Sequence, residues 1–301
     1  MSWLGQNNLT SFQKFCIKVL KYGPVPQHIA IIMDGNRRFA KKTNVQKAEG
    51  HSKGFEKLAE CLNWCRELGI REVTVYAFSI ENFKRSQDEV DHLMQLAKEK
   101  FQKLFEEKDR LMQEGICIRV IGDLSLLSDD LRKLVAEATL LTKDNNRSIL
   151  NVAFSYVSRE EITHSIKTIV KGVEEGYIEN NDISEELISS CLYTYLSSSP
   201  DILIRTSGEV RLSDFLLWQI SQRTEICFTD VLWPEFSIWN LLGIIFKYQR
   251  MVRNNVLHDE GNNTFQDDIN KPTDECRPRI ENFSREMEIK RRKQLEIYAD
   301  A

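Results

Sequence analysis

The sequence has no run of about 18 apolar residues, the length that a membrane-spanning helix requires. Its N-terminus lacks the basic segment followed by an apolar segment that marks a secretory signal. The 7 cysteines are odd in number and form no Cys-x-x-Cys pair, which excludes a disulfide framework and a zinc site of that type. Basic charge is not in excess either, because 41 Lys and Arg stand against 45 Asp and Glu. We therefore expect a soluble or membrane-peripheral protein on the cytosolic side that does not bind nucleic acid.

Several familiar phosphate-binding motifs are also missing. The sequence has no GxxxxGK[ST], no GxGxxG after a strand and no GxSxG elbow, which argues against P-loop NTPases, dinucleotide folds and α/β-hydrolases. The DDxxD pattern by which all-helical prenyl synthases bind metal and diphosphate is absent. Asp129-Asp130 is followed by Leu-Arg-Lys, and Asp267-Asp268 lies in a polar segment near the end of the chain.

Short apolar runs are what the sequence does contain, and they predict the fold. They show little alternation, as is typical of strands buried on both faces, and helical patterns separate most of them. The runs are Ile29–Met33, Val73–Phe78, Ile116–Ile121, Ile149–Phe154, Ile202–Arg205 and Ile226–Phe228. Ser86 with Glu89 and Ser158 with Glu161 predict capping boxes at two helix starts. We expect a single α/β domain with a central parallel sheet of about six strands flanked by helices.

Two appendages differ from this body, so the predicted division is 1–24, 25–249 and 250–301. Residues 1–24 carry Leu9, Phe12, Cys16 and Val19 at helical spacing. Such a helix either packs on the body or contacts a membrane with its apolar face. Residues 250–301 are rich in charge and asparagine, and we expect a solvated helix or disorder there.

The most informative segment follows the first predicted strand and reads Asp34-Gly35-Asn36-Arg37-Arg38. At the carboxyl edge of a parallel sheet, this is where α/β proteins bind ligands. The glycine lets backbone N–H groups approach a phosphate, and the arginines can bind phosphate oxygens in pairs. A single carboxylate among these positive groups favours Mg²⁺ held jointly with substrate phosphates, with Asp34 as the metal ligand. The alternative is an Asp-Gly turn with surface arginines.

Three further arginines follow other predicted strands. Arg85 comes after the second strand, Arg205 closes the fifth, and Arg211 lies six residues beyond it. Because the carboxyl ends of parallel strands share one edge, these arginines can meet Arg37 and Arg38 there. Five converging arginines exceed what one phosphate needs and indicate two diphosphates, although each arginine could instead belong to a salt bridge.

Four stretches carry a family resemblance. They are Asp34-Gly-Asn-Arg-Arg38, Gly50-His-Ser-Lys-Gly54, Tyr76-Ala-Phe-Ser-Ile-Glu-Asn-Phe-Lys-Arg85 and the stretch 201–218, DILIRTSGEVRLSDFLLW. On these motifs, residues from about 25 to 249 resemble a cis-prenyltransferase, and within that family the chain most resembles the catalytic chains of heteromeric animal members.

The resemblance implies roles for residues that match the family's motifs. Asp34 would hold Mg²⁺ on a diphosphate, and His51, Ser79 and Asn82 would lie beside the reacting centre. The allylic diphosphate would be cradled by Gly35, Asn36, Arg37, Arg38 and Arg85. The diphosphate of isopentenyl diphosphate would be bound by Arg205, Arg211 and Ser213. Lys47 stands where bacterial members carry an arginine, and Glu225 lies near the place of a glutamate that assists the metal.

The implied activity is Mg²⁺-dependent, sequential cis-condensation of isopentenyl diphosphate onto farnesyl diphosphate. Its product would be a long-chain polyprenyl diphosphate, a precursor of the dolichol used in protein glycosylation, made at the cytosolic face of the endoplasmic reticulum. The growing chain needs an apolar tunnel, for which two helical stripes are candidates, although ordinary core packing also explains them. The stripes are Val90, Leu93, Met94, Ala97, Phe101 and Leu104, with Leu58, Cys61, Leu62 and Cys65.

One departure from the family's pattern bears on assembly. Homodimeric members end in an Arg-x-Gly motif that completes the isopentenyl diphosphate site, and no Arg-x-Gly occurs after residue 250. This departure implies a Nogo-B receptor-like accessory subunit that supplies the motif and a membrane anchor. Two alternatives remain: a non-catalytic accessory subunit of the same complex, or a self-sufficient homodimer that makes shorter chains.

Overall fold

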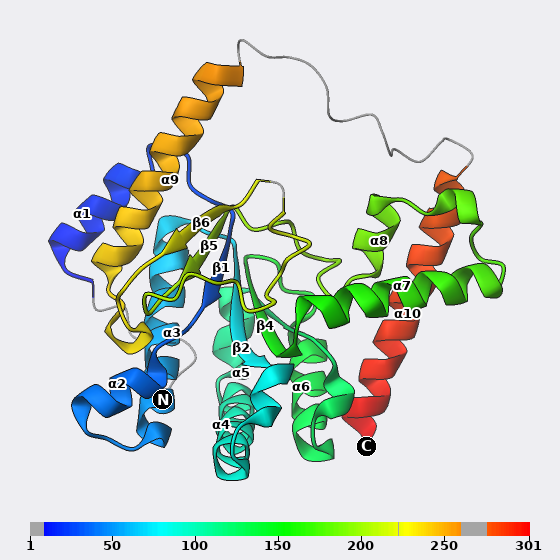
Figure 1. The fold of residues 1–301 in the computed structure, drawn as a ribbon, viewed down its shortest axis with the longest axis horizontal. Coiled ribbons are helices and arrows are strands. Elements are labelled where there is room, and N and C mark those ends of the chain that lie inside the picture. Colours follow the sequence, from blue (N-terminus) through cyan, green and yellow to red (C-terminus); the bar gives the residue numbers. More distant parts are fainter. Residues whose placement is uncertain (1–8, 222, 260–275) are drawn as a thin grey trace.

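A computed structural model describes residues 9–221, 223–259 and 276–301. At its centre is a parallel sheet of six strands in the order β3-β4-β2-β1-β5-β6 (Figure 1). The strands are β1 His28–Ile32, β2 Glu72–Ser79, β3 Ile116–Ile121, β4 Ser148–Tyr156, β5 Ile202–Arg205 and β6 Glu225–Phe228. All six predicted runs are therefore strands, and the predicted α/β fold with one parallel sheet is confirmed.

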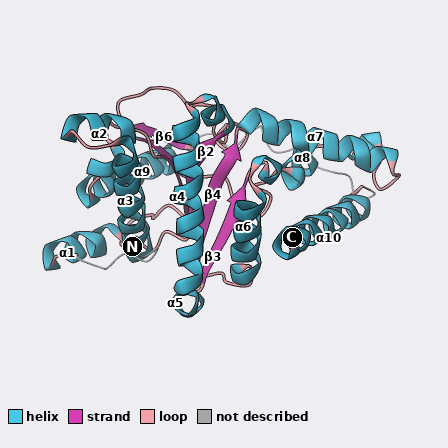
Figure 2. Ribbon diagram, turned by 90° about the horizontal axis from the view of Figure 1, so that it is seen from below, coloured by secondary structure: helices cyan, strands magenta, loops and turns pink. Residues whose placement is uncertain are grey.

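Ten α-helices occur among the described residues, and most of them connect consecutive strands (Figure 2). Helices α3, α4, α6 and α9 contribute to the apolar cluster that covers one face of the sheet. The other face is covered largely by the irregular segment that follows β5. The helices are α1 Ser11–Leu20, α2 Asn36–Thr43, α3 Lys47–Leu68, α4 Gln87–Glu106, α5 Lys108–Glu114, α6 Asp129–Thr142, α7 Ser158–Glu174, α8 Glu185–Cys191, α9 Ile238–Asp259 and α10 Arg277–Asp300.

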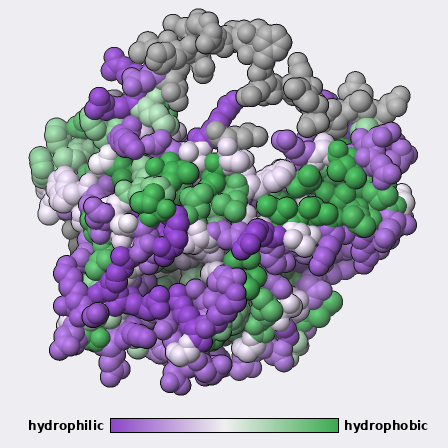
Figure 3. Space-filling model, in the orientation of Figure 1, coloured by the Kyte–Doolittle hydropathy of each residue, from purple (hydrophilic) through white to green (hydrophobic). Residues whose placement is uncertain are grey.

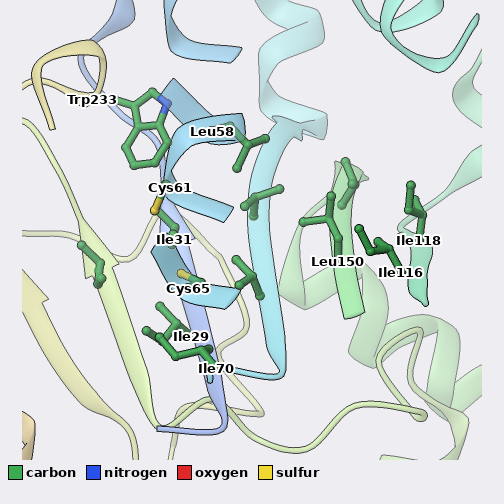
Figure 4. Close-up of a cluster of buried hydrophobic side chains, with 14 of the residues drawn as sticks. Ile29, Ile31, Leu58, Cys61, Cys65, Ile70, Ile116, Ile118, Leu150 and Trp233 are labelled. Carbon is green, nitrogen blue, oxygen red and sulfur yellow. The ribbon is translucent and has the colours of Figure 1, made fainter. Parts of the chain in front are cut away.

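The main core lies between the sheet and α3 (Figure 4). Ile29 and Ile31 of β1 meet Cys61 and Cys65 of α3, and all four side chains are almost fully buried. Trp233 packs at the upper end of this core and is also fully buried. The cysteines are small apolar side chains here, and all those of the described residues are free thiols.

Both predicted capping boxes are wrong, because tertiary contacts use the side chains differently. Ser86 precedes α4 but makes no side-chain cap, and Glu89 binds three cations of other segments instead. Ser158 is the first residue of α7 rather than its cap. Glu161 is fully buried and accepts hydrogen bonds from side chains outside its own helix.

The N-terminal appendage contains α1, which packs on the body as the first alternative predicted. Ile17 is 3% exposed, and the ring of Phe12 lies 5.9 Å from that of Trp239 on α9. Phe12, Phe15 and Val19 nevertheless expose half or more of their surface. The apolar side chains of α1 are visible at the left edge of the molecule in Figure 3.

Part of the charged C-terminal segment forms α10, which lies beside α6 and α8. It differs from a solvated helix because Ile280, Phe283 and Met287 are buried against α7 and α8. Arg291 further attaches α10 by donating to the backbone carbonyls of Ser190 and Cys191 at the end of α8. Residues 260–275 lie outside the described residues, and α9 extends past the predicted boundary at residue 249.

Candidate active site

Asp34 lies just beyond the carboxyl end of β1, and its backbone is held from two sides. The Thr206 hydroxyl accepts from the Asp34 N–H at 3.0 Å and donates to the Asp34 carbonyl at 2.7 Å. The backbone N–H of Trp233 also donates to that carbonyl, at 3.0 Å. Because β1 pairs in parallel with β5, Ile32 lies beside Arg205, so both strands end at the same place. The position of Asp34 is therefore set by the sheet and by two neighbouring segments.

Glycines allow α2 to begin directly after Asp34 and to approach α3 closely. Gly35 has φ +109°, a conformation that residues with a side chain rarely adopt. A Cβ at Gly54 would lie 2.4 Å from the amide oxygen of Asn36, and a Cβ at Gly50 would lie 2.6 Å from its carbonyl oxygen. Gly50 and Gly54 thus admit the α2 N-terminus, whose N–H groups face the site expected for an anion.

The first basic group centres on Arg205, which is 2% exposed. Its guanidinium donates to Asp34 Oδ2 at 2.9 Å, to Ser213 Oγ at 2.7 Å and to the carbonyl of Arg211. Its Nε is buried without a hydrogen-bond partner in the described part of the chain. Arg205 therefore connects the Asp34 segment to the loop that carries Arg211 and Ser213, and it keeps one donor unused.

Arg38 and Arg211 lie near this group and share an acidic partner. Arg38 reaches Glu209 at 3.4 Å and Asp34 at 4.0 Å, and it donates to the hydroxyl of Ser207. Arg211 binds the other oxygen of Glu209. About half or more of each arginine side chain is exposed, so both can exchange these ion pairs for phosphate oxygens.

The second basic group surrounds Glu89 of α4. Arg85 reaches Glu89 at 2.9 Å, Lys47 at 3.4 Å and Arg37 at 3.8 Å. Burial opposes ionisation of Glu89, but the three cations around it lower the pKa of its carboxyl. Burial, with the charge of Arg37, lowers the pKa of Arg85. Three cations on one carboxylate leave an excess of positive charge that favours a bound anion.

His51 of α3 lies between this basic group and an apolar cavity. Burial, together with the positive charge of Arg85, lowers the pKa of His51 to about 4, so the imidazole is neutral near pH 7. Its Nε2 is buried with no hydrogen-bond partner among the described residues. Ser79 and Asn82 are linked to each other, since the Ser79 N–H donates to Asn82 Oδ1 at 3.1 Å and the Ser79 hydroxyl accepts from the Glu81 N–H. They shape the turn that follows β2.

The apolar cavity has a volume of about 140 Å³ and opens beside His51 and Asn36. Of the predicted tunnel residues, four line it: Leu58, Leu93, Ala97 and Phe101. Leu62 and Cys65 line a second cavity of about 40 Å³ farther along α3. Val90, Cys61 and Leu104 are buried in the core, in agreement with the packing alternative.

The residues fit a magnesium ion held jointly with a substrate. Asp34 is the carboxylate nearest Arg205, and its side chain is 32% exposed, so it is open on one side. The described residues contain no group of three or more His, Cys, Asp or Glu side chains that could hold a metal alone. One carboxylate plus phosphate oxygens is an arrangement that Mg²⁺ commonly adopts.

Comparison with known proteins identifies the family. Residues 32–255 match the prenyltransferase family model of undecaprenyl diphosphate synthases. The chain is 57% identical over 249 residues to the human dehydrodolichyl diphosphate synthase complex subunit DHDDS, covering 83% of this chain and 74% of that protein. It is 46% identical to a dehydrodolichyl diphosphate synthase complex subunit of Schizosaccharomyces pombe, covering 81% and 92%. The chain belongs to the cis-prenyltransferase family.

A solved structure supports the same assignment. Lavandulyl diphosphate synthase from Lavandula x intermedia, in complex with dimethylallyl diphosphate, aligns with this cis-prenyltransferase at a TM-score of 0.71 and 36% sequence identity. The alignment covers 75% of this chain and 95% of that chain. The family resemblance carried by the four sequence motifs is thereby confirmed.

The structure places one sequence candidate of this cis-prenyltransferase, Glu225, away from Asp34. Glu225 pairs with Ile202 at the start of β5, whereas Arg205 pairs with Phe228 at its end. The Glu225 carboxylate binds Lys247 at 2.7 Å instead. Three residues of strand separate it from the Asp34 edge, about 10 Å along the strand. The register of β5 and β6, which local sequence does not reveal, sets this separation within the chain.

Two acidic residues of the site were not predicted from the sequence. Glu89 and Glu209 each bind more than one arginine of the site. The sequence pattern predicts a capping box for Glu89 and predicts no role for Glu209, which lies within the 201–218 stretch. The available signal was that so many convergent arginines need counter-charges when no substrate is bound.

The lowered pKa of His51 predicts a pH-dependent stability. Because the unfolded imidazole, with a pKa of 6.5, binds a proton before the folded one does, stability falls as pH drops from about 6.5 toward 4. Between about pH 7.5 and pH 5, wild type should lose roughly 2 kcal/mol more unfolding free energy than His51→Gln. Urea denaturation at both pH values measures this difference. Equal losses in the two proteins would contradict a buried neutral His51.

Proposed function

We propose that this chain is the catalytic subunit of a dehydrodolichyl diphosphate synthase, adding isopentenyl units in cis to farnesyl diphosphate. The observation that carries the proposal is one carboxylate, Asp34, flanked by two basic groups at the sheet edge beside an apolar cavity. This arrangement matches the two substrates, which together carry two diphosphate groups and one long apolar chain. The human and yeast relatives, named as subunits of this synthase complex, support the same assignment.

The arginines would be divided between the two substrates, and Arg38, which reaches Asp34 and Glu209 of the first basic group, would serve the allylic diphosphate. Arg37, Arg38 and Arg85, with the backbone of Gly35 and Asn36, would bind the allylic diphosphate. Breaking the allylic C–O bond places negative charge on the departing diphosphate, and prepositioned guanidinium groups stabilise that charge most in the transition state. Arg205, Arg211 and Ser213 would hold isopentenyl diphosphate, so that its double bond is placed for attack.

Asp34 would hold Mg²⁺ together with diphosphate oxygens. When bound, the ion neutralises charge on the diphosphate and makes it a better leaving group. Asp34 already accepts from Arg205 and from the Gly35 N–H, so its orientation is set before the metal arrives. His51, neutral near pH 7, would lie beside the reacting carbons without adding a competing positive charge.

The apolar cavity beside His51 would receive the growing chain. Its lining by Leu58, Phe101 and neighbouring side chains keeps water from the isoprenoid and its cationic reaction centre. The second cavity, at Leu62 and Cys65, lies in the direction in which a longer product would extend along α3. A long-chain polyprenyl diphosphate, the precursor of dolichol, is the product that we assign.

An accessory subunit would complete the enzyme. No Arg-x-Gly motif occurs after residue 250, and the human relative is named as a subunit of a complex. We assign this role to a Nogo-B receptor-like chain that supplies the motif to the isopentenyl diphosphate site and the membrane anchor. None of the described helices is both long and apolar enough to cross a bilayer.

Peripheral contact with the cytosolic face of the endoplasmic reticulum membrane would involve α1. Phe12, Phe15 and Val19 are 63%, 60% and 51% exposed, although the opposite side of α1 packs on the body. Aromatic side chains of this kind insert at the boundary between headgroups and acyl chains. This arrangement would place the apolar product close to the bilayer that receives it.

The decisive experiment co-expresses the chain with its accessory subunit and supplies farnesyl diphosphate, radiolabelled isopentenyl diphosphate and Mg²⁺. We expect long-chain polyprenyl products, a loss of at least about 100-fold in kcat/KM with Asp34→Asn, and loss of activity with EDTA. Full activity of the Asp34→Asn complex would instead identify the chain as a non-catalytic subunit. Robust synthesis of shorter chains by the isolated chain would identify a self-sufficient enzyme.

Arg211→Ala tests the division between two diphosphate sites. The substitution removes a guanidinium from the proposed isopentenyl diphosphate site, so the KM for isopentenyl diphosphate should rise about ten-fold or more. The KM for farnesyl diphosphate should change less than about two-fold. Steady-state kinetics with each substrate varied in turn measures both values. Equal increases for the two substrates would contradict separate sites.

Phe15→Glu tests the membrane contact. The substitution places a charge on the exposed face of α1. It should reduce binding of the catalytic chain to vesicles of phosphatidylcholine and phosphatidylserine by about five-fold. Ile166→Glu is the matched control, because Ile166 is 49% exposed on α7, away from α1. Cosedimentation with the vesicles gives the bound fraction. Equal binding by both variants and wild type would leave α1 with a packing role alone.

A further inference from the structure

The loop that carries Ser213 has an unfavourable backbone conformation. Ser213, Asp214 and Leu216 have φ values of +51°, +58° and +50°, although none of them is glycine. Such conformations cost on the order of 1 kcal/mol or more per residue and persist only where neighbouring groups hold them in place. The loop therefore needs strong attachments, and those attachments set the position of Ser213.

The start of α7 provides the strongest of these attachments, through Asp214. The Ser158 N–H donates to the Asp214 carbonyl at 2.7 Å, and the Arg159 N–H donates to Asp214 Oδ1 at 3.1 Å. Arg159 Nε donates to the second carboxylate oxygen, Oδ2, at 2.7 Å. The Asp214 side chain is only 12% exposed, whereas that of Arg159 is 77% exposed. Asp214, from a distant loop, thus satisfies the first two N–H groups of α7, that of Ser158 with its carbonyl oxygen and that of Arg159 with its carboxylate, which lies at the positive end of the helix dipole.

Three further contacts hold the residues on either side of Asp214. The Ser158 hydroxyl accepts from the Leu217 N–H at 3.0 Å. The Tyr76 hydroxyl lies 3.2 Å from the carbonyl of Ser213 and 3.1 Å from that of Tyr156, and its one proton is shared between these two acceptors. Phe215 is fully buried and stacks on the Tyr76 ring, with centroids 4.5 Å apart. Ser213 is therefore fixed from β2 on one side and from α7 on the other.

Ser213 connects this attachment directly to the proposed isopentenyl diphosphate site. Ser213 Oγ accepts from Arg205 at 2.7 Å, and the same guanidinium binds Asp34 at 2.9 Å. Displacing the Asp214 segment would move Ser213 and remove one of the partners that orient Arg205. Among the residues that the structure describes, Arg37 and Arg85 are held through Glu89 instead, whereas Arg38 meets this chain of contacts beyond Arg205, at Asp34.

We propose that Asp214, anchored to Ser158 and Arg159 at the start of α7, is a positioning residue for the isopentenyl diphosphate site. It acts through Ser213 and Arg205 and does not itself touch the substrate. The inference rests on the proposed function for the identity of the substrate. The hydrogen bonds that attach the loop to α7 do not depend on that identity.

Asp214→Ala and Asp214→Asn separate positioning from general stability. Alanine removes the carboxylate and is poorly suited to φ +58°, whereas asparagine tolerates this φ and keeps one oxygen for the Arg159 N–H. In the complex with its accessory subunit, Asp214→Ala should raise the KM for isopentenyl diphosphate about ten-fold, because a hydrogen-bonded charged group is lost. Asp214→Asn should raise it less than about three-fold. The KM for farnesyl diphosphate should stay within about two-fold of wild type in both variants.

Asp123→Ala is the matched control. Asp123 also accepts from a nearby backbone N–H, that of Ser125 at 3.0 Å, but it lies after β3 and outside the site. Its loss should leave both KM values unchanged. An Asp214→Ala variant that raises both KM values equally, or that lowers only the melting temperature, would overturn the proposal. So would a failure of Asp214→Asn to recover the affinity.

Isothermal titration calorimetry with isopentenyl diphosphate separates this inference from the proposed function. If the wild-type complex binds isopentenyl diphosphate but does not elongate farnesyl diphosphate, the proposed function fails. In that case the positioning role is tested by binding alone. It requires Asp214→Ala to weaken the binding of isopentenyl diphosphate about ten-fold relative to wild type. If Asp214→Ala binds as tightly as wild type, the positioning role is wrong even in an active enzyme.

Discussion

The ion pair between Arg205 and Asp34 is the interaction on which the rest of the site depends. Arg205 is buried at the end of β5, where an unpaired guanidinium would be strongly destabilising, so Asp34 must face it from β1. The parallel register of these two strands brings the residues together. Loss of Asp34 would leave the buried guanidinium of Arg205 without its carboxylate, at a cost of roughly 3–5 kcal/mol. The same pair also connects the proposed metal ligand to the proposed isopentenyl diphosphate site.

The rest of the site contains more arginine and lysine side chains than carboxylates to pair with them. Arg38 and Arg211 share Glu209, while Arg37, Arg85 and Lys47 share Glu89. Each acid holds several cations in place without neutralising all of them, which leaves two positions where an incoming diphosphate is favoured. The formal net charge of −4 conceals this local excess because the acidic residues are distributed over the whole chain. Local geometry, rather than total charge, explains the affinity for polyanions that we propose.

The strands could be predicted from the sequence because both faces of a central parallel sheet are buried, so each strand appears as a continuous apolar run. Asp34 and Arg205 could also be placed at one edge, because they immediately follow such runs. Helix starts were less predictable. Ser158 and Glu161 have the spacing of a capping box, yet Glu161 binds Tyr156 and Gln219, and Asp214 supplies the acceptor at the start of α7. These partners are more than 50 residues away in two of the three cases and leave no local signal.

By itself, the sequence determined the strands, the edge of the sheet that carries the site and the family to which the chain belongs. Those properties depend on apolar runs and on short motifs, both of which are local. The tertiary structure alone decided which acid faces which arginine, that Glu225 lies at the opposite end of its strand, and that α10 buries one face. It also decided that α7 holds the Ser213 loop in its unfavourable conformation. These features depend on strand register and on contacts between distant segments, because ion pairs and hydrogen bonds form only where folding has brought both partners within about 3 Å.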